Sequence, residues 1–315
     1  MPKKPIGDMH LPMMDRRRFL ACLSAAAAGV AFEAHARTET QPHRRTIPSS
    51  GERLPIIGMG SYITFDIDDD TEALQQRIRV LSAFFEAGGK LIDSSPMYDN
   101  SEAVLGQALS SLGRPVDLFS ATKVWHMFTA AGDRQMTNSR SLWGNPGFDL
   151  MQVHNLVNWF DHLQTLQRDK AEGLVRYVGI TTSHGRRHDE LLDIMRKEPL
   201  DFVQFTYNIL DREAEHKLLP LAADQGIAVI INRPFRRKSL INRFEKYPLP
   251  PWSEDIGCKT WPPFLLKFIV SHPAVTCAIP ATSRVEHMRE NMAALHGPLP
   301  DRRMRQAMID YVGTL

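Results

Sequence analysis

The chain has 315 residues, of which 43% are hydrophobic and 23% are charged, and it contains only three cysteines. This composition is typical of a globular protein and excludes intrinsic disorder, a collagen-like repeat and a small disulfide-stapled domain. The formal net charge is +2, but residues 1–36 hold five basic and three acidic groups, so the rest of the chain carries 33 of each. A body with balanced charge gives no electrostatic reason to expect nucleic acid or an anionic membrane surface as the main partner.

The first 36 residues are arranged like a secretory signal peptide. Consecutive arginines at 16–18 precede an apolar stretch at 21–31, and an Ala-x-Ala triplet ends at Ala36. The apolar stretch is shorter than the roughly 20 residues that a spanning helix needs. Paired arginines followed one residue later by Phe-Leu resemble a twin-arginine signal. We therefore predict recognition by the twin-arginine export machinery, cleavage after Ala36, a periplasmic mature protein and no stable membrane insertion after cleavage.

After a predicted linker at 37–49, short apolar and β-branched runs alternate with longer segments that have helical spacing. The predicted strands are 54–57, 91–93, 116–122, 149–153, 175–180, 202–205, 227–231 and 275–279. The predicted helices are 74–85, 101–112, 159–172, 189–197, 213–224, 263–271 and 284–295. Two stretches, 126–147 and 236–256, are predicted to be long loops, and the second of them is basic and then proline-rich.

The alternation of strand and helix every thirty to forty residues or so predicts right-handed βαβ units and a parallel sheet. Eight strands favour closure into a barrel, because closure leaves no strand edge unpaired. We therefore predict a single-domain α/β protein, a (β/α)8 TIM barrel over residues 50–315, with an open doubly wound sheet as the alternative. That alternative lacks its usual G-x-G-x-x-G signature, because the run that begins at Gly58 has no third glycine.

Titratable side chains stand where three consecutive predicted strands end. Asp93, Lys123 and His154 close the apolar runs of these strands, and Tyr98 follows Asp93 by five residues. The carboxyl ends of barrel strands meet at one face, which is where barrel enzymes have their active sites. We therefore expect the four side chains to converge in one pocket.

These segments resemble the aldo-keto reductase family over about residues 50–296. The stretch 93–98 and the Ser-Glu pair that follows it are similar to the family's Asp…Tyr signature, while 119–125 and 149–154 are similar to its lysine and histidine strands. The resemblance implies the barrel fold and NAD(P)H-dependent reduction of an aldehyde or ketone, or the reverse reaction on an alcohol. The implied partner is a small-molecule carbonyl or alcohol substrate.

The chemistry of carbonyl reduction explains the four residue types. Hydride attack leaves an alkoxide that needs a proton, and a phenol with a pKa near 10 is a poor donor unless its anion is stabilised. The resemblance implies that Tyr98 is the general acid/base and that the Lys123 ammonium stabilises its anion. Asp93 is expected to hold Lys123 in place and keep it charged. His154 is expected to orient the substrate oxygen by a hydrogen bond.

The resemblance also implies a site for NADP, or for NAD in its place. The expected cofactor-binding residues are Gly60, Ser61, Asp93, Thr181, Thr182, Gln204, Asn232, Arg233, Pro234, Thr282, Ser283, Arg284, Glu290 and Asn291. Two of them depart from the family's pattern, since Thr182 stands for an asparagine and Asn232 for the aromatic ring that stacks on the nicotinamide. Arg284 is expected at the 2′-phosphate of NADP, but Ala281 stands where some relatives carry a lysine, which leaves NAD open.

The basic residues at 236–238 are expected to cover the cofactor's pyrophosphate as a lid. No metal site is predicted, because His184 and His188 have the i, i+4 spacing of a metal pair but no third ligand is in view, and no C-x-x-C pattern is present. Cys258 and Cys277 are open to two interpretations, a disulfide in an oxidising compartment or buried packing of Cys277.

Two other functions are open. An exported protein that binds or senses the nucleotide with little turnover is favoured by the substitutions at Thr182 and Asn232. A barrel isomerase or lyase would use Lys123 as a Schiff-base amine.

Overall fold

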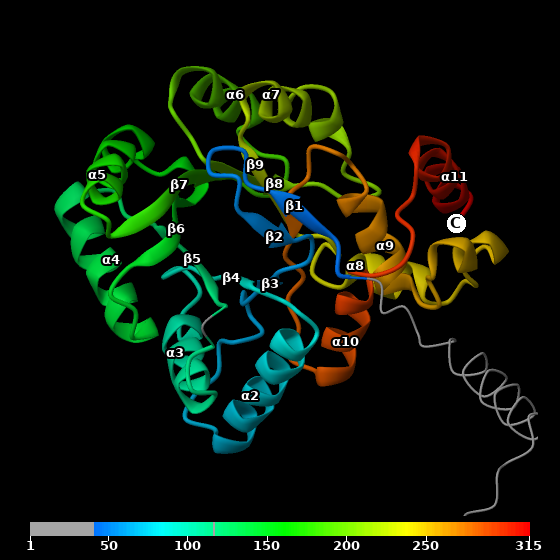
Figure 1. Cartoon of the computed structure of the whole chain (residues 1–315), viewed down its shortest axis with the longest axis horizontal. Coiled ribbons are helices and arrows are strands. Elements are labelled where there is room, and N and C mark those ends of the chain that lie inside the picture. The colour runs from blue at the N-terminus through cyan, green and yellow to red at the C-terminus, as the bar shows by residue number, and fades with distance from the viewer. Residues whose placement is uncertain (1–40, 116) are drawn as a thin grey trace, which may run out of the picture. The chain divides into compact units, whose positions relative to one another are not determined.

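The computed structural model describes residues 41–115 and 117–315, and residues 42–315 form one compact unit. Eight parallel strands make the barrel: β3 (Met59–Gly60), β4 (Leu91–Asp93), β5 (Phe119–Val124), β6 (Phe148–Val153), β7 (Val175–Thr181), β8 (Phe202–Thr206), β9 (Ala228–Asn232) and β10 (Cys277–Ala278) (Figure 1). They follow one another in the sheet in chain order. Parallel bridges from Ile57 to Ala278 and from Gly60 to Ala281 join the last strand to the first. The predicted (β/α)8 TIM barrel is confirmed.

Helices surround the barrel (Figure 1). The helices at predicted positions are α2 (Thr71–Glu86), α3 (Ser101–Ser111), α5 (Trp159–Ala171), α6 (His188–Lys197), α7 (Leu218–Gln225), α9 (Trp261–Val270) and α10 (Val285–Ala293). The start of the helix predicted at 213–224 is a 3₁₀ turn, η2 (Glu213–Glu215). The large apolar side chains of these helices pack against the outward-facing residues of the strands in one continuous core.

The segment predicted as a loop at 126–147 is in fact mostly helical. Helix α4 (Thr129–Trp143) buries Gly132, Met136, Ser139 and Trp143, which recur at intervals of four and three residues. This is the spacing of one helix face, but two of its four members are small or polar. Gly132 is needed because a Cβ at that position would lie 2.4 Å from the His162 ring. Apolar periodicity therefore misses this helix.

The stretch predicted as a loop at 236–256 also contains helical turns, α8 (Ser239–Phe244) and η3 (Pro251–Ile256). A helix that was not predicted, α11 (Arg302–Gly313), follows the barrel. The Asp301 side chain caps α11 by accepting a hydrogen bond from the Met304 backbone N–H at 2.7 Å. In the view of Figure 1, α11 lies near α9 at the edge of the molecule.

The first predicted strand, 54–57, is corrected by the structure. Strand β2 (Arg53–Pro55) pairs antiparallel with β1 (Arg44–Thr46), so Leu54 and Pro55 belong to a hairpin, whereas Ile57 already bridges β10 and leads into the first barrel strand. Strand β1 lies within the stretch predicted as a linker at 37–49. The hairpin carries two fully buried residues, Ile47 and Leu54, that join one apolar cluster with residues from the barrel interior. The run at 54–57 is apolar because it passes from the hairpin, which closes the amino-terminal end of the barrel, into the barrel wall, where Ile56 and Ile57 join the outer core.

The inward-facing residues of the strands change from apolar to polar toward the carboxyl ends. On β4, Leu91 is followed two residues later by Asp93, and on β5 Phe119 is followed by Lys123. Residues two apart on a strand share a face, so each pair points to the same side. The barrel is thus closed by apolar packing at one end and is lined by polar groups at the other.

Three predictions concern features outside this architecture. The predicted signal peptide at 1–36 lies outside the described residues. Within the part of the chain that the structure describes, every helix is too short or too polar to cross a bilayer. Cys258 and Cys277 are both buried and both free thiols.

Candidate active site

A cavity of about 950 Å³ lies at the carboxyl ends of the barrel strands. All of the predicted cofactor-binding residues, from Gly60 to Asn291, line it. Tyr98 and His154 also line it, whereas Lys123 is fully buried behind the cavity wall. The structure thus brings these residues together around one cavity.

Lys123 and Asp93 form an ion pair that is closed to solvent. The Lys123 ammonium donates to Asp93 Oδ2 and to the Ser94 carbonyl, each at 2.6 Å. The other carboxylate oxygen, Asp93 Oδ1, accepts from the side-chain amides of Gln152 and Gln204, both at 3.0 Å. Burial disfavours the ammonium, but the Asp93 carboxylate and the Tyr98 hydroxyl together outweigh it and raise the pKa of Lys123. A lysine held in its charged form is a poor amine nucleophile, so the geometry gives no support to Schiff-base chemistry.

Tyr98 lies in the turn between β4 and α3, with its ring between two other rings. The ring centroids of Tyr62 and His154 are 4.8 Å and 5.7 Å away, and Lys123 Nζ is 5.1 Å from the centre of the Tyr98 ring. Burial raises the pKa of the Tyr98 hydroxyl, and the positive charge of Lys123 acts in the opposite direction. The hydroxyl is consequently protonated at neutral pH, while Lys123 is placed to stabilise the anion once the proton leaves.

His154 begins the 3₁₀ turn η1 (His154–Leu156) directly after β6. Its Nδ1 atom is 2.8 Å from Ser95 Oγ, and its ring meets the Tyr98 ring edge to face. Burial, together with the charge of Lys123, lowers the pKa of His154 well below its ordinary value. The imidazole is neutral at physiological pH, which makes it a hydrogen-bond donor or acceptor rather than a cation.

Polar residues at the ends of β7, β8 and β9 form a second network beside the first. The Asn232 amide donates to the Thr182 carbonyl at 2.9 Å and to Gln204 Oε1 at 3.3 Å, and its oxygen accepts from Thr206 Oγ1 at 2.7 Å. Asn232 is thus held by protein groups on both sides of its amide. It forms a fixed polar wall of the cavity where an aromatic residue is expected from the family resemblance.

The Thr182 hydroxyl is the one hydrogen-bonding group of this network without a protein partner in the described residues. Its Oγ1 atom is buried, and the residue is only 2% exposed yet lines the cavity. Buried polar atoms rarely stay unsatisfied, so such a group points to a ligand or to ordered water. A nicotinamide carboxamide fits this position, because it carries both a donor and an acceptor.

Of the three basic residues predicted to form a lid, Arg237 and Lys238 line the cavity, whereas Arg236 does not. Arg236 turns away to Asp211, where its Nε donates to Oδ2 at 2.6 Å. Arg237 instead crosses to the loop after β3, where its guanidinium lies 4.8 Å from the centre of the Tyr62 ring and contacts the hydroxyl. Burial and the neighbouring positive charge of Arg237 lower the pKa of Arg233. Because Arg233 and Arg237 both line the cavity, this part of its rim is cationic.

The connection from β10 to α10 supplies the opposite rim. Thr282 Oγ1 accepts from the Arg284 backbone N–H at 3.2 Å, which fixes the turn before the helix begins. The Arg284 side chain is 63% exposed, and its Nε lies 3.6 Å from Glu286. A mostly solvated guanidinium near the start of a helix can bind a phosphate without breaking a buried contact.

Sequence reasoning assigned no role to Ser95, Tyr62 or Gln152, although each contacts a predicted site residue. It also missed the environment of Glu102, a buried carboxylate that accepts from Thr122 Oγ1 at 2.6 Å and from groups on α4. The signal for Ser95 was its place between Asp93 and Tyr98. The partners of Glu102 could not be found, since α4 itself was not predicted. In the described part of the chain, no three His, Cys, Asp or Glu side chains gather as a metal site.

A parallel barrel with a buried Lys–Asp pair, a tyrosine and a neutral histidine at one cavity defines the class of protein. The family description that matches the chain is that of the aldo/keto reductase family, over residues 57–251. The chain belongs to this family.

Relatives and solved structures agree with that assignment. The chain is 26% identical over 268 residues to the NADH-specific methylglyoxal reductase of Escherichia coli (strain K12), covering 68% of this chain and 81% of that protein. It is 28% identical over 206 residues to aldo-keto reductase YhdN of Bacillus subtilis (strain 168), covering 59% and 60%.

Among solved structures, an aldo/keto reductase from Klebsiella pneumoniae in complex with NADP and acetate superimposes with a TM-score of 0.72. The identity is 23%, and the match covers 85% of this chain and 94% of that one. The holo form of an aldo-keto reductase from Bacillus halodurans gives a TM-score of 0.71 at 21% identity, covering 86% and 96%. At this level of identity the likeness shows the fold.

Proposed function

We propose that the protein is a nicotinamide-dependent oxidoreductase that reduces an aldehyde or ketone to an alcohol, or catalyses the reverse, with Tyr98 as general acid/base. The observation that carries the proposal is the fully buried Lys123–Asp93 pair next to the Tyr98 ring, at the floor of a large cavity. A charged lysine in such a place serves a neighbouring group, because burying it costs free energy that a surface position would not.

In the proposed reduction, the hydride for the carbonyl carbon would come from bound NAD(P)H, and the carbonyl oxygen would take up a proton. Tyr98 donates that proton from its hydroxyl, and the Lys123 ammonium stabilises the phenolate that remains. Asp93 keeps Lys123 charged and fixed, and His154 hydrogen-bonds the substrate oxygen. In the oxidative direction the Tyr98 phenolate accepts the proton of the alcohol.

We propose NADP as the preferred cofactor, with NAD as the alternative. Thr181, Thr182 and Gln204 would hold the nicotinamide end, and Arg284 with Asn291 would hold the adenosine end. The complex of the Klebsiella pneumoniae relative with NADP supports the first choice, and the NADH-specific Escherichia coli relative supports the second. The exposed, weakly paired Arg284 favours NADP, because it is free to meet a 2′-phosphate.

The test of this function is Tyr98→Phe. We expect a loss of turnover of about 100-fold to 10,000-fold, the usual contribution of a general acid, with the dissociation constant of NADPH unchanged. Tyr177→Phe is the matched control, because it removes a phenol from the opposite end of the barrel. Burial also raises the pKa of the Tyr177 hydroxyl. Turnover of Tyr98→Phe equal to that of the control would remove Tyr98 from the mechanism.

A second candidate is a protein that binds or senses the nucleotide with little turnover. The observation in its favour is the fixed Asn232 amide, which occupies the cavity wall without offering an aromatic face. Turnover of a panel of small carbonyls with NADPH and NADH separates the two candidates. Cofactor binding without reduction of any compound in the panel would favour this second function.

We also propose that the protein is exported by the twin-arginine route and is periplasmic after cleavage at Ala36. The support is the order of arginines, apolar stretch and Ala-x-Ala triplet within residues 1–36. Because free NADPH is not expected outside the cytoplasm, the cofactor would be loaded before export. Protein from the periplasmic fraction should begin near Arg37 and release a nicotinamide nucleotide on denaturation. A full-length cytoplasmic protein would contradict export, and a cofactor-free periplasmic protein would contradict loading before export.

A further inference from the structure

The contact between Ser95 and His154 is not used by the mechanism as proposed. Ser95 Oγ lies 2.8 Å from His154 Nδ1, with Ser95 fully buried and His154 only 5% exposed. Neither side chain can exchange this contact for water without opening the wall of the cavity. The pair therefore fixes the donor and acceptor roles of both groups.

The roles follow from the other hydrogen bonds of Ser95. Its oxygen accepts from the Met97 backbone N–H at 3.2 Å, and the serine hydroxyl has one hydrogen to give. Among the described residues, His154 Nδ1 is the only other hydrogen-bonding partner of this oxygen. If Nδ1 carried a hydrogen, the serine hydrogen would be buried without an acceptor, which native structures avoid. The hydroxyl therefore donates to an unprotonated Nδ1.

We propose that Ser95 is a positioning residue that holds His154 in the tautomer with its hydrogen on Nε2, so that Nε2 donates to the substrate oxygen beside Tyr98. The inference rests on the proposed function and deepens it. Nε2 makes no hydrogen bond to a described residue, and His154 lines the cavity. The ring edge that carries the hydrogen is consequently available to a ligand.

The neutrality of His154 makes the tautomer matter. A neutral imidazole has one N–H, whereas an imidazolium has two, so only in the neutral ring does the choice of nitrogen decide what the substrate meets. With the hydrogen on Nε2, His154 polarises the carbonyl and adds to the Tyr98 proton donor. With the hydrogen on Nδ1, the lone pair of Nε2 would face the lone pairs of the substrate oxygen and repel them.

The test combines nitrogen NMR with kinetics on the full mature protein. Histidines are labelled with ¹⁵N, and His154→Asn identifies the resonances of His154 by their loss. Ser95→Ala removes the hydroxyl, Ser95→Thr keeps it, and Ser120→Ala is the matched control. Ser120 is a buried serine on the neighbouring strand β5, and its hydroxyl donates to Asp149 Oδ2 at 3.0 Å, at the amino-terminal end of the barrel.

We expect the Nε2–H tautomer in the unmodified protein, a mixture of tautomers in Ser95→Ala, and the original tautomer in Ser95→Thr. In Ser95→Ala, kcat should fall about tenfold, as one lost hydrogen bond implies, while the dissociation constant of NADPH stays the same. Ser95→Thr should recover most of the loss, and Ser120→Ala should change neither the tautomer nor kcat.

Three results would overturn the inference: an Nδ1–H tautomer in the unmodified protein, a lower kcat in Ser95→Ala without a change of tautomer, or a changed tautomer without a change of kcat. The tautomer of the unmodified protein remains a test even where Ser95→Ala does not fold. The same NMR measurement still tests the inference if the unmodified protein reduces no carbonyl. That result would contradict the proposed function but not the assigned tautomer.

Discussion

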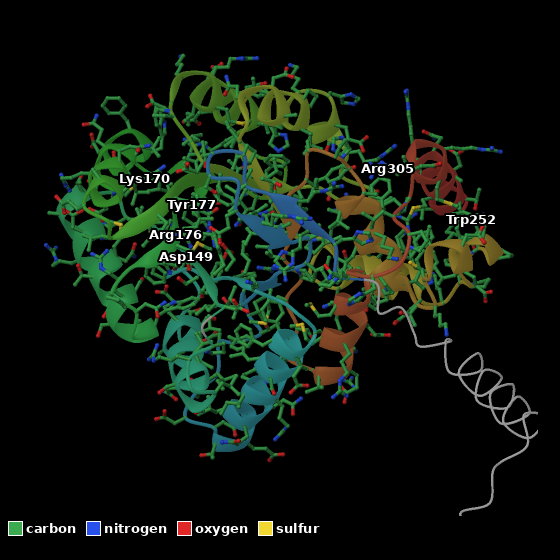
Figure 2. The ribbon with its side chains drawn as sticks, viewed as in Figure 1. Asp149, Lys170, Arg176, Tyr177, Trp252 and Arg305 are labelled. Atoms are coloured by element: carbon green, nitrogen blue, oxygen red, sulfur yellow. The ribbon has the colours of Figure 1, made fainter. Side chains whose placement is uncertain are left out.

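The two ends of the barrel both gather tyrosine, basic and acidic side chains, but they use them differently. At the amino-terminal end, the Tyr177 hydroxyl lies 2.7 Å from Ser50 Oγ and 2.8 Å from Glu52 Oε2. Arg176 bridges Glu52 and Asp149, with 2.6 Å between its Nη1 and Asp149 Oδ1. Figure 2 shows Asp149, Arg176 and Tyr177 close together near the start of β6 and β7. The charged and hydroxyl groups of this cluster satisfy one another.

At the carboxyl-terminal end the polar groups are more deeply buried and are not all satisfied. Lys123 and Asp93 are 0% and 2% exposed, whereas Arg176 at the other end is 51% exposed. Thr182 Oγ1 has no partner among the described residues, and His154 Nε2 has none either. The half-exposed charges at the amino-terminal end are paired with one another, whereas buried charges beside unsatisfied donors and acceptors are typical of a ligand-binding site.

The largest contrast between the two ends should come from Lys123→Met. Removing one partner of a buried pair leaves Asp93 charged and uncompensated, which costs about 3–5 kcal/mol of unfolding free energy, and turnover should fall at least as far as in Tyr98→Phe. The double variant Lys123→Met with Asp93→Asn removes both charges. Urea unfolding should show that the double variant regains stability, while its turnover stays lost.

That double variant separates the two roles of the pair. Recovery of turnover together with stability would mean that the charge of Lys123 serves only the fold. In that case the buried ion pair would have a structural role only, like the Arg176 ion pairs at the amino-terminal end.

Arg284→Ala should have the next largest effect, on the choice of cofactor. If Arg284 binds the 2′-phosphate, the dissociation constant of NADPH should rise about tenfold, as expected for a lost charge-assisted hydrogen bond, and that of NADH should not change. Arg196→Ala is the control, because Arg196 is similarly exposed and pairs with an acid of its own helix, Asp193, at 3.1 Å. Fluorescence titration with NADPH and NADH measures both dissociation constants. An equal loss of affinity for the two nucleotides would exclude a contact between Arg284 and the 2′-phosphate.

The acid stability of the protein should depend on the carboxyl-terminal end. His154 has a lowered pKa in the folded state and an ordinary value of about 6.5 when unfolded. Below pH 6.5 the unfolded chain therefore binds a proton at this histidine that the folded chain does not bind. The free energy of unfolding consequently falls as the pH is lowered, until the pKa of the folded state is reached. The loss is about 1.4 kcal/mol for each unit by which the pKa is lowered.

His154→Gln should flatten this pH dependence when unfolding is followed in urea from about pH 7.5 to about pH 5. Part of the slope should remain, because burial also lowers the pKa of His184, His188 and His272. Arg176 and Tyr177 of the amino-terminal cluster do not contribute to this slope, since their pKa values are raised. An unchanged slope in His154→Gln would show that the ring is not held neutral by the fold.

The sequence predicts the carboxyl-terminal end well, because its residues follow directly from strand ends. Asp93, Lys123 and His154 each come at the end of an apolar run, and the barrel brings such positions together at one face. A local pattern in the chain thus specifies a long-range arrangement. Most of the residues expected to bind the cofactor also lie at or just after a strand end, whereas Glu290 and Asn291 lie on α10, and all of them line the same cavity.

The sequence predicts poorly wherever a partner comes from a distant, irregular segment. Arg236 pairs with Asp211 from the connection after β8, and nothing near either residue in the chain indicates the other. Helix α4 packs a glycine and a serine against its neighbours, so its buried face is not apolar. The apolar run at 54–57 continues from the hairpin into the barrel, and only the pairing with β1 shows that its first part is not a barrel strand.

The smallest effect should come from Arg176→Met at the amino-terminal end. Because Arg176 and Glu52 are 51% and 34% exposed, solvent screens the pair, and the loss should be at most about 1 kcal/mol in urea unfolding. High salt should reduce the difference from the unmodified protein, since it screens exposed charges. Turnover should not change. Strand β6 carries Asp149 at its start and Gln152, a partner of Asp93, near its end, so a lower kcat in Arg176→Met would show that the closed end positions the reactive one through this strand.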